Sequence, residues 1–424
     1  MRVTHVIGEG IPNPTSGGGA LTAWTVVSHL LDQGHAVRVV CVLPPEAEPL
    51  REERLARLRE LGASVSVVPS RAAEHYGSLR RDLRTRARRA WRPEEEELNP
   101  YLVDAPAVRA SVAETEPDAV FVYHFEGLAA SRTVDAPRLA AVGDPPHLPV
   151  WYRLRDGLPH PRALRGLVRV QAVLRHQPDL AVRLLNECSA CGAFAAHHAA
   201  RLRRRGAVDC EYLRTPVPDP LGDGWRAERD RMTAHRRPRL LLLGHLRGIV
   251  TIDGLRVFAQ QVLPTLERRL GADGFEVRVV GGHEPPPEVR RAFARPSVRL
   301  LGHLEQPDEE LKTADALLVP SRIPLGIRVR IVTAFSYGCP VVTHESSRLG
   351  IPELDHGRNA LVGRSGRDLA EAFLRLVSDA ELKERLERGG RETYERWFAP
   401  RVAAGRIAAM LERIVRRPAA VPAR

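Results

Sequence analysis

The sequence predicts an α/β protein made of two doubly wound, Rossmann-like domains, each built on a parallel sheet. Short apolar segments typical of strands alternate with longer segments whose apolar residues recur at helical spacing. The chain has 424 residues, more than one hydrophobic core usually organises. Residues 314–343 also contain, in order, a strand, a glycine-containing loop, a helix and a strand, the unit from which such sheets are built.

The first half of the chain contains the predicted strands 3–7, 37–43, 64–68, 119–123 and 139–142. Helical spacing is found at residues 20–33, around Leu55 and Leu58, and at 164–184. Gly34 and Gly62 follow the first two of these helices, as expected of C-terminal caps.

Residues 217–238 are polar and rich in proline and arginine, which predicts a linker. A second series of elements follows it. The predicted strands are 240–243, 275–280, 298–301, 316–319 and one beginning at Pro340, and the predicted helices are 253–270, the segment after Gly326, 368–395 and 401–416.

Composition narrows the class of protein. The net charge of +12 favours anionic partners, although heavy arginine use is also typical of GC-rich genomes. No motif for nucleic-acid binding accompanies the charge, so we expect no nucleic-acid partner. Five scattered cysteines, no signal peptide and no long apolar run predict a cytoplasmic protein.

Residues 78–92 form a basic amphipathic segment. One hypothesis is peripheral contact with an anionic membrane, at its inner face. The favoured alternative is a solvated helix whose arginines pair with the acidic run 94–97.

The segment 314–343 reads ADALLVPSRIPLGIRVRIVTAFSYGCPVVT. Its apolar strand stops at Pro320, and a loop containing Gly326 leads into a helix that carries Arg328 and Arg330 near its start. Free backbone N–H groups and guanidinium groups at such a place suit phosphate.

This segment, followed by GIPELDHGRNALV, resembles the donor-binding segment of retaining GT-B glycosyltransferases, family 4 in particular. The resemblance implies the GT-B fold, with two Rossmann-like domains facing a central cleft that closes over the substrates. It also implies an acceptor-side domain at 1–216, a linker at 217–238 and a donor-binding domain at 239–398. The C-terminal helix, 399–424, would then pack back on the first domain.

The resemblance also assigns donor-binding residues. The diphosphate and sugar would contact Gly17, Gly18, Gly19, His245, Arg247, Gly326, Ile327, Arg328 and Arg330. The nucleoside would contact Gly302, His303, Leu304 and Thr333. His245 stands where the family usually has an arginine.

The paired glutamates of the family's E-x7-E motif are replaced here by Leu325 and Thr333. The second glutamate normally accepts hydrogen bonds from the ribose, and Thr333 offers only one hydroxyl. This departure raises the question of whether the chain uses an ordinary donor, or has full activity.

By the same resemblance, His124 and Asp144 are the candidate catalytic residues. His124 ends a buried-type strand and would contact a hydroxyl of the transferred sugar, although a lone histidine there is more often a core residue. Asp144 would contact sugar or acceptor, or cap the turn at Pro145.

Cys188 and Cys191 with His197 and His198 have half of a zinc-site spacing. Adjacent histidines on a helix point in different directions, and cysteines in an apolar helix are usually core residues. We therefore expect no metal and no cofactor, with the sugar nucleotide as co-substrate.

The predicted function is transfer of a sugar from a nucleoside diphosphate sugar to an acceptor hydroxyl, with retention and without a metal. The pathway would make a polysaccharide, a glycolipid or a natural-product glycoside. The alternatives are a weak or inactive GT-B module that binds sugar nucleotide or glycan, and a GT-B sugar-nucleotide epimerase. A nicotinamide-linked oxidoreductase is disfavoured because the dinucleotide glycine spacing is missing.

Overall fold

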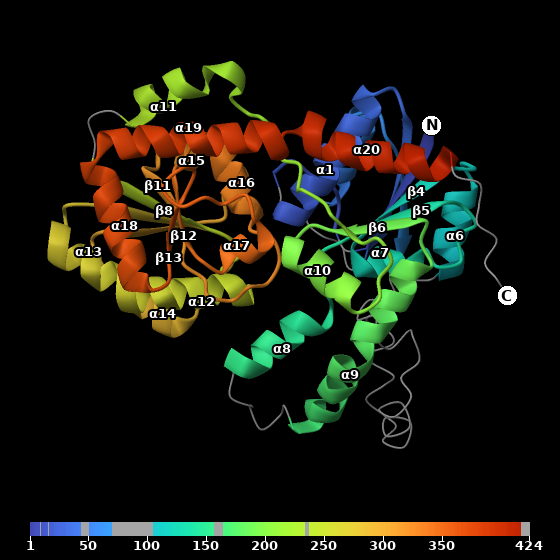
Figure 1. Cartoon of the computed structure of the whole chain (residues 1–424), viewed down its shortest axis with the longest axis horizontal. Coiled ribbons are helices and arrows are strands. Elements are labelled where there is room, and N and C mark those ends of the chain that lie inside the picture. Colours follow the sequence, from blue (N-terminus) through green and yellow to red (C-terminus); the bar gives the residue numbers. More distant parts are fainter. Residues whose placement is uncertain are drawn as a thin grey trace. The chain divides into compact units, whose positions relative to one another are not determined.

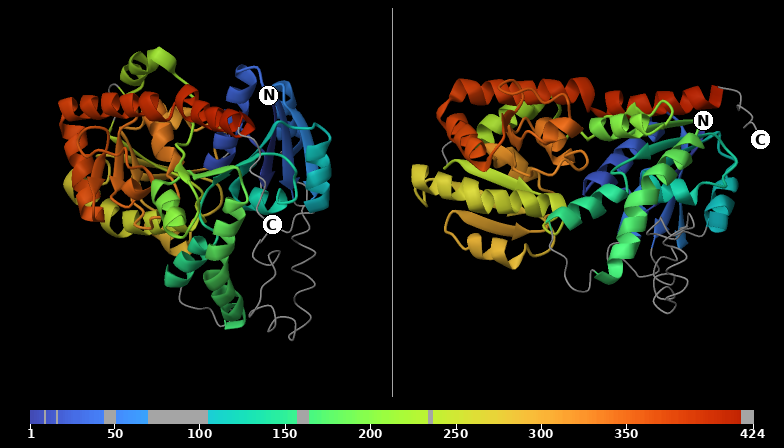
Figure 2. Two further views of the ribbon diagram at one scale, coloured as in Figure 1. Left: turned by 45° about the vertical axis from the view of Figure 1, so that its right-hand side comes forward. Right: turned by 60° about the horizontal axis from the view of Figure 1, so that its bottom comes forward.

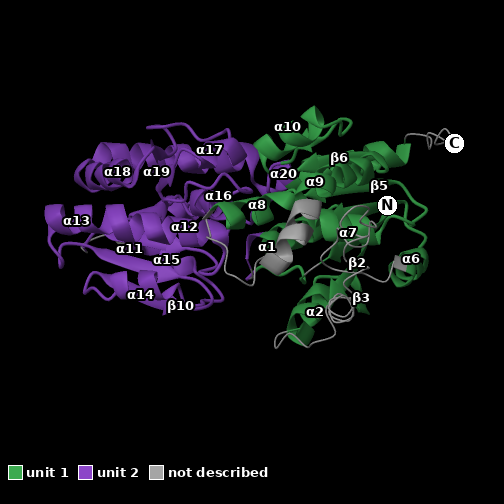
Figure 3. Ribbon diagram, turned by 90° about the horizontal axis from the view of Figure 1, so that it is seen from below, with its two compact units in different colours: residues 1–14, 19–213, 404–424 green, residues 15–18, 214–403 purple. Residues whose placement is uncertain are grey.

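The computed structural model describes residues 1–8, 10–15, 17–43, 51–69, 105–156, 164–233 and 237–416. The chain divides into two compact units (Figure 3). Unit 1 contains Met1–Pro14, Gly19–Leu213 and Ala404–Arg424, and unit 2 contains Thr15–Gly18 and Arg214–Ala403. The basic segment 78–92 lies outside the described residues, so its two interpretations stay predictions.

Unit 1 is built on a parallel sheet, with seven strands among the described residues in the order β3-β2-β1-β4-β5-β6-β7. The strands are β1 (Arg2–Gly8), β2 (Ala36–Leu43), β3 (Ser64–Pro69), β4 (Ala119–Tyr123), β5 (Arg138–Val142), β6 (Ala190–Ala193) and β7 (Glu211–Tyr212). The chain changes direction across the sheet between β1 and β4, which makes this pair the point where ligands bind doubly wound sheets.

The helices that cover this sheet are α1 (Gly18–Asp32), α2 (Arg51–Glu60), α6 (Ala105–Ala113), α7 (His124–Ala130), α8 (His147–Asp156), α9 (Leu164–Asn186) and α10 (Ala196–Arg204). One core cluster joins the sheet to α6, α7, α9 and α10 through buried residues such as Val112, Leu128, Leu185 and Leu202. All residues of β4 and β5 are buried, as expected of central strands covered on both faces.

Unit 2 repeats this plan with six parallel strands in the described part of the chain, in the order β10-β9-β8-β11-β12-β13 (Figure 1). They are β8 (Arg239–Leu243), β9 (Glu276–Val280), β10 (Val298–Gly302), β11 (Ala316–Val319), β12 (Val341–His344) and β13 (Leu361–Gly363). The direction changes between β8 and β11, and both strands are continuous apolar runs.

The helices of unit 2 are η2 (Gly222–Gly224), α11 (Trp225–Thr233), α12 (Ile249–Val257), η3 (Phe258–Val262), α13 (Leu263–Leu270), α14 (Pro287–Ala292), α15 (Asp308–Thr313), α16 (Val329–Ser336), α17 (Ser347–Gly350), α18 (Gly366–Ser378) and α19 (Ala380–Trp397). The predicted helix 253–270 is continuous but contains a π-helical stretch at η3. Figure 2 shows helices on both faces of each sheet.

The last helix, α20 (Pro400–Arg416), belongs to unit 1 from residue 404 onward. Arg406 and Arg413 on this helix pair with Glu211 of β7 at 2.6 and 2.9 Å. These ion pairs hold α20 against β7, the edge strand of the first sheet.

Cys191 lies in strand β6, not in the apolar helix that the sequence suggested. The strand ACGA is short and made of small residues, so it lacks the hydrophobic alternation that identifies a strand. Cys191 is nevertheless buried, in agreement with a core role.

None of the helices in the described part of the chain has the length and hydrophobicity that a membrane span requires.

Candidate active site

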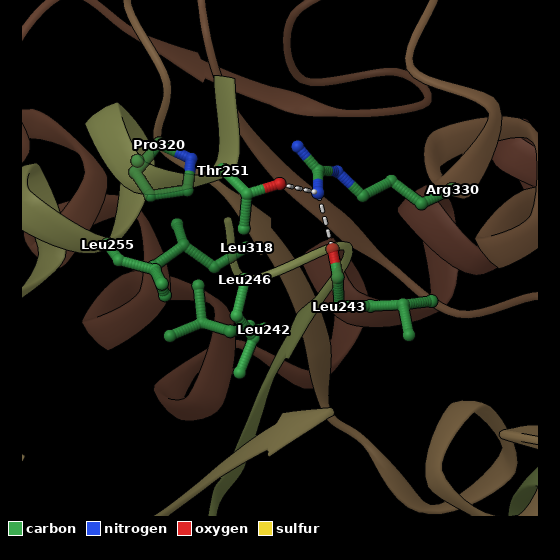
Figure 4. A pocket seen from close by; sticks show the side chains of 9 residues that line it. Leu242, Leu243, Leu246, Thr251, Leu255, Leu318, Pro320 and Arg330 are labelled. Carbon is green, nitrogen blue, oxygen red and sulfur yellow. Dashed lines mark hydrogen bonds between the residues drawn. The ribbon is translucent and has the colours of Figure 1, made fainter. Parts of the chain in front are cut away.

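In unit 2 the carboxyl ends of β8 and β11 border a small pocket at the topological switch point (Figure 4). It is lined by Leu242, Leu243, Leu246, Thr251, Gly254, Leu255, Leu318, Pro320 and Arg330. Apart from Thr251 and Arg330, the lining is apolar or backbone.

Arg330, in the first turn of α16, reaches across to β8. Its Nη1 donates to the backbone oxygen of Leu243 and to Oγ1 of Thr251, the latter at 3.4 Å (Figure 4). Its Nε has no hydrogen-bond partner among the described residues, and no carboxylate in that part of the chain pairs with it. Burial, and then the charge of Arg328, lower the pKa of Arg330 to about 9. This arginine is therefore a half-buried cation whose hydrogen-bond partners among the described residues are neutral groups.

Gly244, the first residue after β8, makes room for this guanidinium. A Cβ at position 244 would collide with Nη1 of Arg330 and stand 2.9 Å from Oγ1 of Thr251. The φ of Gly244 is +154°, at the edge of the region that favours glycine.

Arg328 makes different contacts from those of Arg330. It is the N-cap residue of α16, is buried, and donates to the carbonyl oxygens of Ile323 and Leu325. Its guanidinium thus fixes the loop before the helix, in which Gly326 has a φ of +67°. Ile327 follows in the same loop and is half-buried.

The other predicted donor residues lie at the same edge of the sheet. His245 and Arg247 follow β8 and are exposed, and Gly302, His303 and Leu304 lie at and just after the end of β10. The N–H of Gly281 donates to the oxygen of Gly302 at 2.8 Å, which ties the end of β9 to the end of β10.

Neither position of the missing glutamate pair supplies a carboxylate. Leu325 is buried, and Thr333 donates its hydroxyl to the oxygen of Val329 one turn earlier, at 3.2 Å. The nearby Glu353 pairs with Arg214 at 2.8 Å. Thr333 can still accept a hydrogen bond through its lone pairs.

In unit 1, His124 follows β4 at the switch point. Its φ is +62°, a left-handed conformation that is rare outside glycine and that clusters at functional sites. The ring packs closely: a Cβ on Gly143 would stand 2.6 Å from Nδ1, and one on Gly19 would stand 3.5 Å from Nε2. Burial lowers the pKa of His124 to about 4, so the imidazole is neutral at pH 7.

Tyr123 connects this histidine to the glycine loop, and sequence reasoning missed it. Its hydroxyl donates to the oxygen of Gly19 at 3.0 Å, and its ring meets that of His124 edge-on at 4.2 Å. The sequence contained a signal for Tyr123, because this tyrosine directly precedes His124 at the end of the strand.

The other two glycines of this loop make few contacts that the structure describes. Nothing lies within 4 Å of the place where a Cβ on Gly17 would stand, and Gly18 is the first residue of α1.

Asp144 follows β5, the next strand along the sheet. Its Oδ1 lies 3.4 Å from Nδ1 of the fully buried His198 on α10. Burial, helped by His197 and Arg201, lowers the pKa of His198 to about 2, so this contact involves a neutral ring. The structure thus places Asp144 one strand away from His124.

No three His, Cys, Asp or Glu side chains gather closely enough to hold a metal ion among the residues that the structure describes. Cys188 and Cys191 are free thiols there, and burial raises the pKa of Cys188 to about 12.

Comparison with known protein families finds a match for part of unit 2. Residues 237–379 match a family model described as glycosyl transferases group 1. No curated protein sequence matches this chain.

Solved structures align over nearly the whole chain. Anabaena Alr3699/HepE, in complex with UDP and glucose, has a TM-score of 0.66 and 15% identity over 97% of this chain and 99% of its own. Sucrose-phosphate synthase from Thermosynechococcus elongatus has a TM-score of 0.67 and 15% identity over 98% and 99%. A mutant of TarM from S. aureus has a TM-score of 0.67 and 8% identity over 98% and 100%.

The two parallel-sheet units and these structural neighbours show that the chain has the GT-B fold, with a segment of its second unit similar to glycosyl transferases of group 1.

Proposed function

We propose that the protein is a glycosyltransferase that moves a sugar from a nucleoside diphosphate sugar to an acceptor hydroxyl. The observation that carries the proposal is Arg330, a half-buried guanidinium at the switch point of unit 2 without a carboxylate partner among the described residues. A partly buried cation of this kind is stabilised when an anion binds. The group 1 match over the same segment, and a neighbour crystallised with UDP-glucose, support a sugar nucleotide as that anion.

The residues divide the work as follows. Arg330 and Arg247 neutralise the leaving diphosphate, while Arg328 holds the loop at Gly326 and Ile327 in shape through the carbonyls of Ile323 and Leu325. Neutral His124 contacts a hydroxyl of the transferred sugar, and Asp144 contacts sugar or acceptor. Developing charge is thereby met by groups already in position.

The finer assignments are part of the same proposal. Transfer proceeds with retention and without a metal, as the resemblance to family 4 implies. The acceptor belongs to a polysaccharide, a glycolipid or a natural product, and the protein works in the cytoplasm or at the inner face of a membrane.

A thermal-shift panel tests the donor. UDP, GDP, ADP, dTDP and their glucose esters are each added to the full chain. A ligand at one hundred times its Kd stabilises the folded state by about 2.7 kcal/mol, so a true donor raises Tm measurably.

Two arginine variants test whether the nucleotide binds at Arg330. Arg330→Met keeps the side chain's length but removes its charge, and should lose the shift. Arg256→Met removes an exposed arginine that pairs with Glu288 at 2.9 Å and should keep it. The proposal fails if none of these compounds raises Tm, or if Arg330→Met retains the full shift.

A second candidate function is a binding module without transfer, favoured by Leu325 and Thr333 at the glutamate positions. Release of free sugar from the bound donor, measured without an acceptor, separates the two. Steady hydrolysis supports the enzyme, and tight binding without any turnover supports the module.

A further inference from the structure

A glycine followed by a histidine lies at or just after the end of each of strands β8, β9 and β10: Gly244-His245, Gly282-His283 and Gly302-His303. Because these neighbouring strands are parallel, the three dipeptides lie at one edge of the sheet. The first two imidazoles are in contact, with ring centroids 4.7 Å apart and planes inclined by 60°. Both residues are exposed.

The backbone holds His283 in an unusual conformation. Its φ is +69°, in the left-handed region, which costs a non-glycine residue about 1–2 kcal/mol. Two residues earlier, Gly281 lies against the start of the loop after β8, because a Cβ there would collide with the oxygen of Gly244. The loops that follow β8 and β9 therefore approach each other closely beside the contact of His283 with His245.

The charged groups around this pair are mainly cationic. Arg247 lies on the same loop as His245, and the guanidinium of Arg330 lies against the adjacent Gly244. On the β9 loop, Glu284 faces Arg290 at 3.6 Å. No carboxylate in the described part of the chain pairs with either imidazole.

In the free protein the surroundings of His245 disfavour its protonation. Partial burial, and then the charges of His283 and Arg247, lower its pKa below the ordinary value. An anion placed over the rings would have the opposite effect, because it favours the protonated form.

We propose that His245 and His283 form a proton-accepting site for the pyrophosphate of the donor, so that the donor binds together with a proton and binds more tightly at lower pH. This inference rests on the proposed function and deepens it. Where a guanidinium would be charged at every pH, an imidazole pair is charged only when protonated. Donor capture by this protein is thereby coupled to pH.

Isothermal titration calorimetry with UDP-, GDP-, ADP- and dTDP-glucose tests the coupling. Each phosphate of a sugar nucleotide has one ester and one anhydride bond and keeps a single strongly acidic group, so the ligand itself does not change its charge near neutral pH. For the compound that binds, uptake of one proton lowers Kd by up to about tenfold per pH unit between about pH 8 and about pH 6. The binding enthalpy should also depend on the ionisation enthalpy of the buffer.

Single variants identify the proton acceptor. His245→Gln and His283→Gln should each reduce the pH dependence, whereas Arg247→Gln should weaken binding at both pH values and keep a pH dependence. His176→Gln, on α9 of unit 1, removes an imidazole elsewhere and should behave like the wild type.

The outcomes distinguish failure of this inference from failure of the proposed function. Equal affinity at both pH values, or an unchanged pH dependence in both glutamine variants, overturns this inference and leaves the proposed function standing. If none of the four compounds binds at either pH, both fall.

Discussion

Arg330 and Gly244 are complementary: Nη1 of the arginine lies where a Cβ on the glycine would stand. The cation is held by the oxygen of Leu243 and the hydroxyl of Thr251, and the glycine is what allows it to approach β8. The geometry of the pocket thus depends on a residue that carries no chemistry of its own.

Gly244→Ala should disrupt this arrangement. The added methyl group displaces the guanidinium and strains the backbone at a φ of +154°. We expect a loss of about 1–3 kcal/mol in the free energy of unfolding and a loss of the nucleotide-induced rise in Tm. The control is Gly224→Ala, because a Cβ at that position meets nothing within 4 Å. It should change neither the free energy of unfolding nor the nucleotide-induced rise in Tm. Equal losses in the two variants would contradict this account of the pocket.

Replacement of His124 should separate its conformational role from its chemical one. His124→Asn suits a left-handed φ and should fold nearly as stably as the wild type, yet lower the rate of donor hydrolysis by about 100-fold. His124→Val should in addition lose about 1–3 kcal/mol of stability, because a β-branched residue is strained there. Full activity in His124→Asn would remove this residue from the catalytic proposal.

Histidines that are fully or partly buried predict acid sensitivity. Burial lowers the pKa of His5, His124 and His147 to about 4, so these rings stay neutral in the folded chain where the unfolded chain is already protonated. Stability should be full above about pH 6.5 and should fall as the pH drops toward about 4, by up to about 1.4 kcal/mol per pH unit for each ring.

His5→Gln checks this dependence in urea titrations at several pH values. His5 stacks on Phe121 at 4.8 Å inside the sheet, and its removal should make the acid decline shallower. His356→Gln removes an exposed imidazole and should leave the slope of the wild type. An unchanged slope in His5→Gln would refute the assignment.

Two arginines of α11, one buried and one exposed, allow a matched test of how burial changes an arginine's contribution to the free energy of unfolding. Arg229 is fully buried and donates to the oxygens of Leu311, Lys312 and Ala314 and to Glu387. Arg229→Ala leaves Glu387 and these carbonyls unpaired, so we expect a loss of about 3–5 kcal/mol in the free energy of unfolding.

The control lies one turn away. Arg226 pairs with Glu384 at 2.8 Å, but both side chains are exposed, so Arg226→Ala should cost less than about 1 kcal/mol. Chemical denaturation of the two variants gives the comparison, and similar losses would contradict it.

Much of the architecture could be predicted from local pattern. Strands such as β4, β8 and β11 are apolar runs, apart from Arg239 at the start of β8, and each becomes a mainly buried strand of a parallel sheet. Strands β6 and β13 could not be identified, because ACGA and LVG are too short to show a period. Their place is set by pairing with β5 and β12.

Of the candidate site, the sequence determined that His124, Asp144 and His245 stand just after strands and that Arg328 and Arg330 stand at the start of a helix. Only the tertiary structure decided what each can do. Arg328 and Arg330 are two residues apart, yet one is bound to its own loop and the other reaches β8 through space opened by Gly244. The contact of His245 with His283 brings together the loops after β8 and β9, which are separated in the sequence by the helical segment 249–270. Hydrophobic periodicity fixes local structure, whereas burial, charge balance and contact depend on which chain segments the fold brings together.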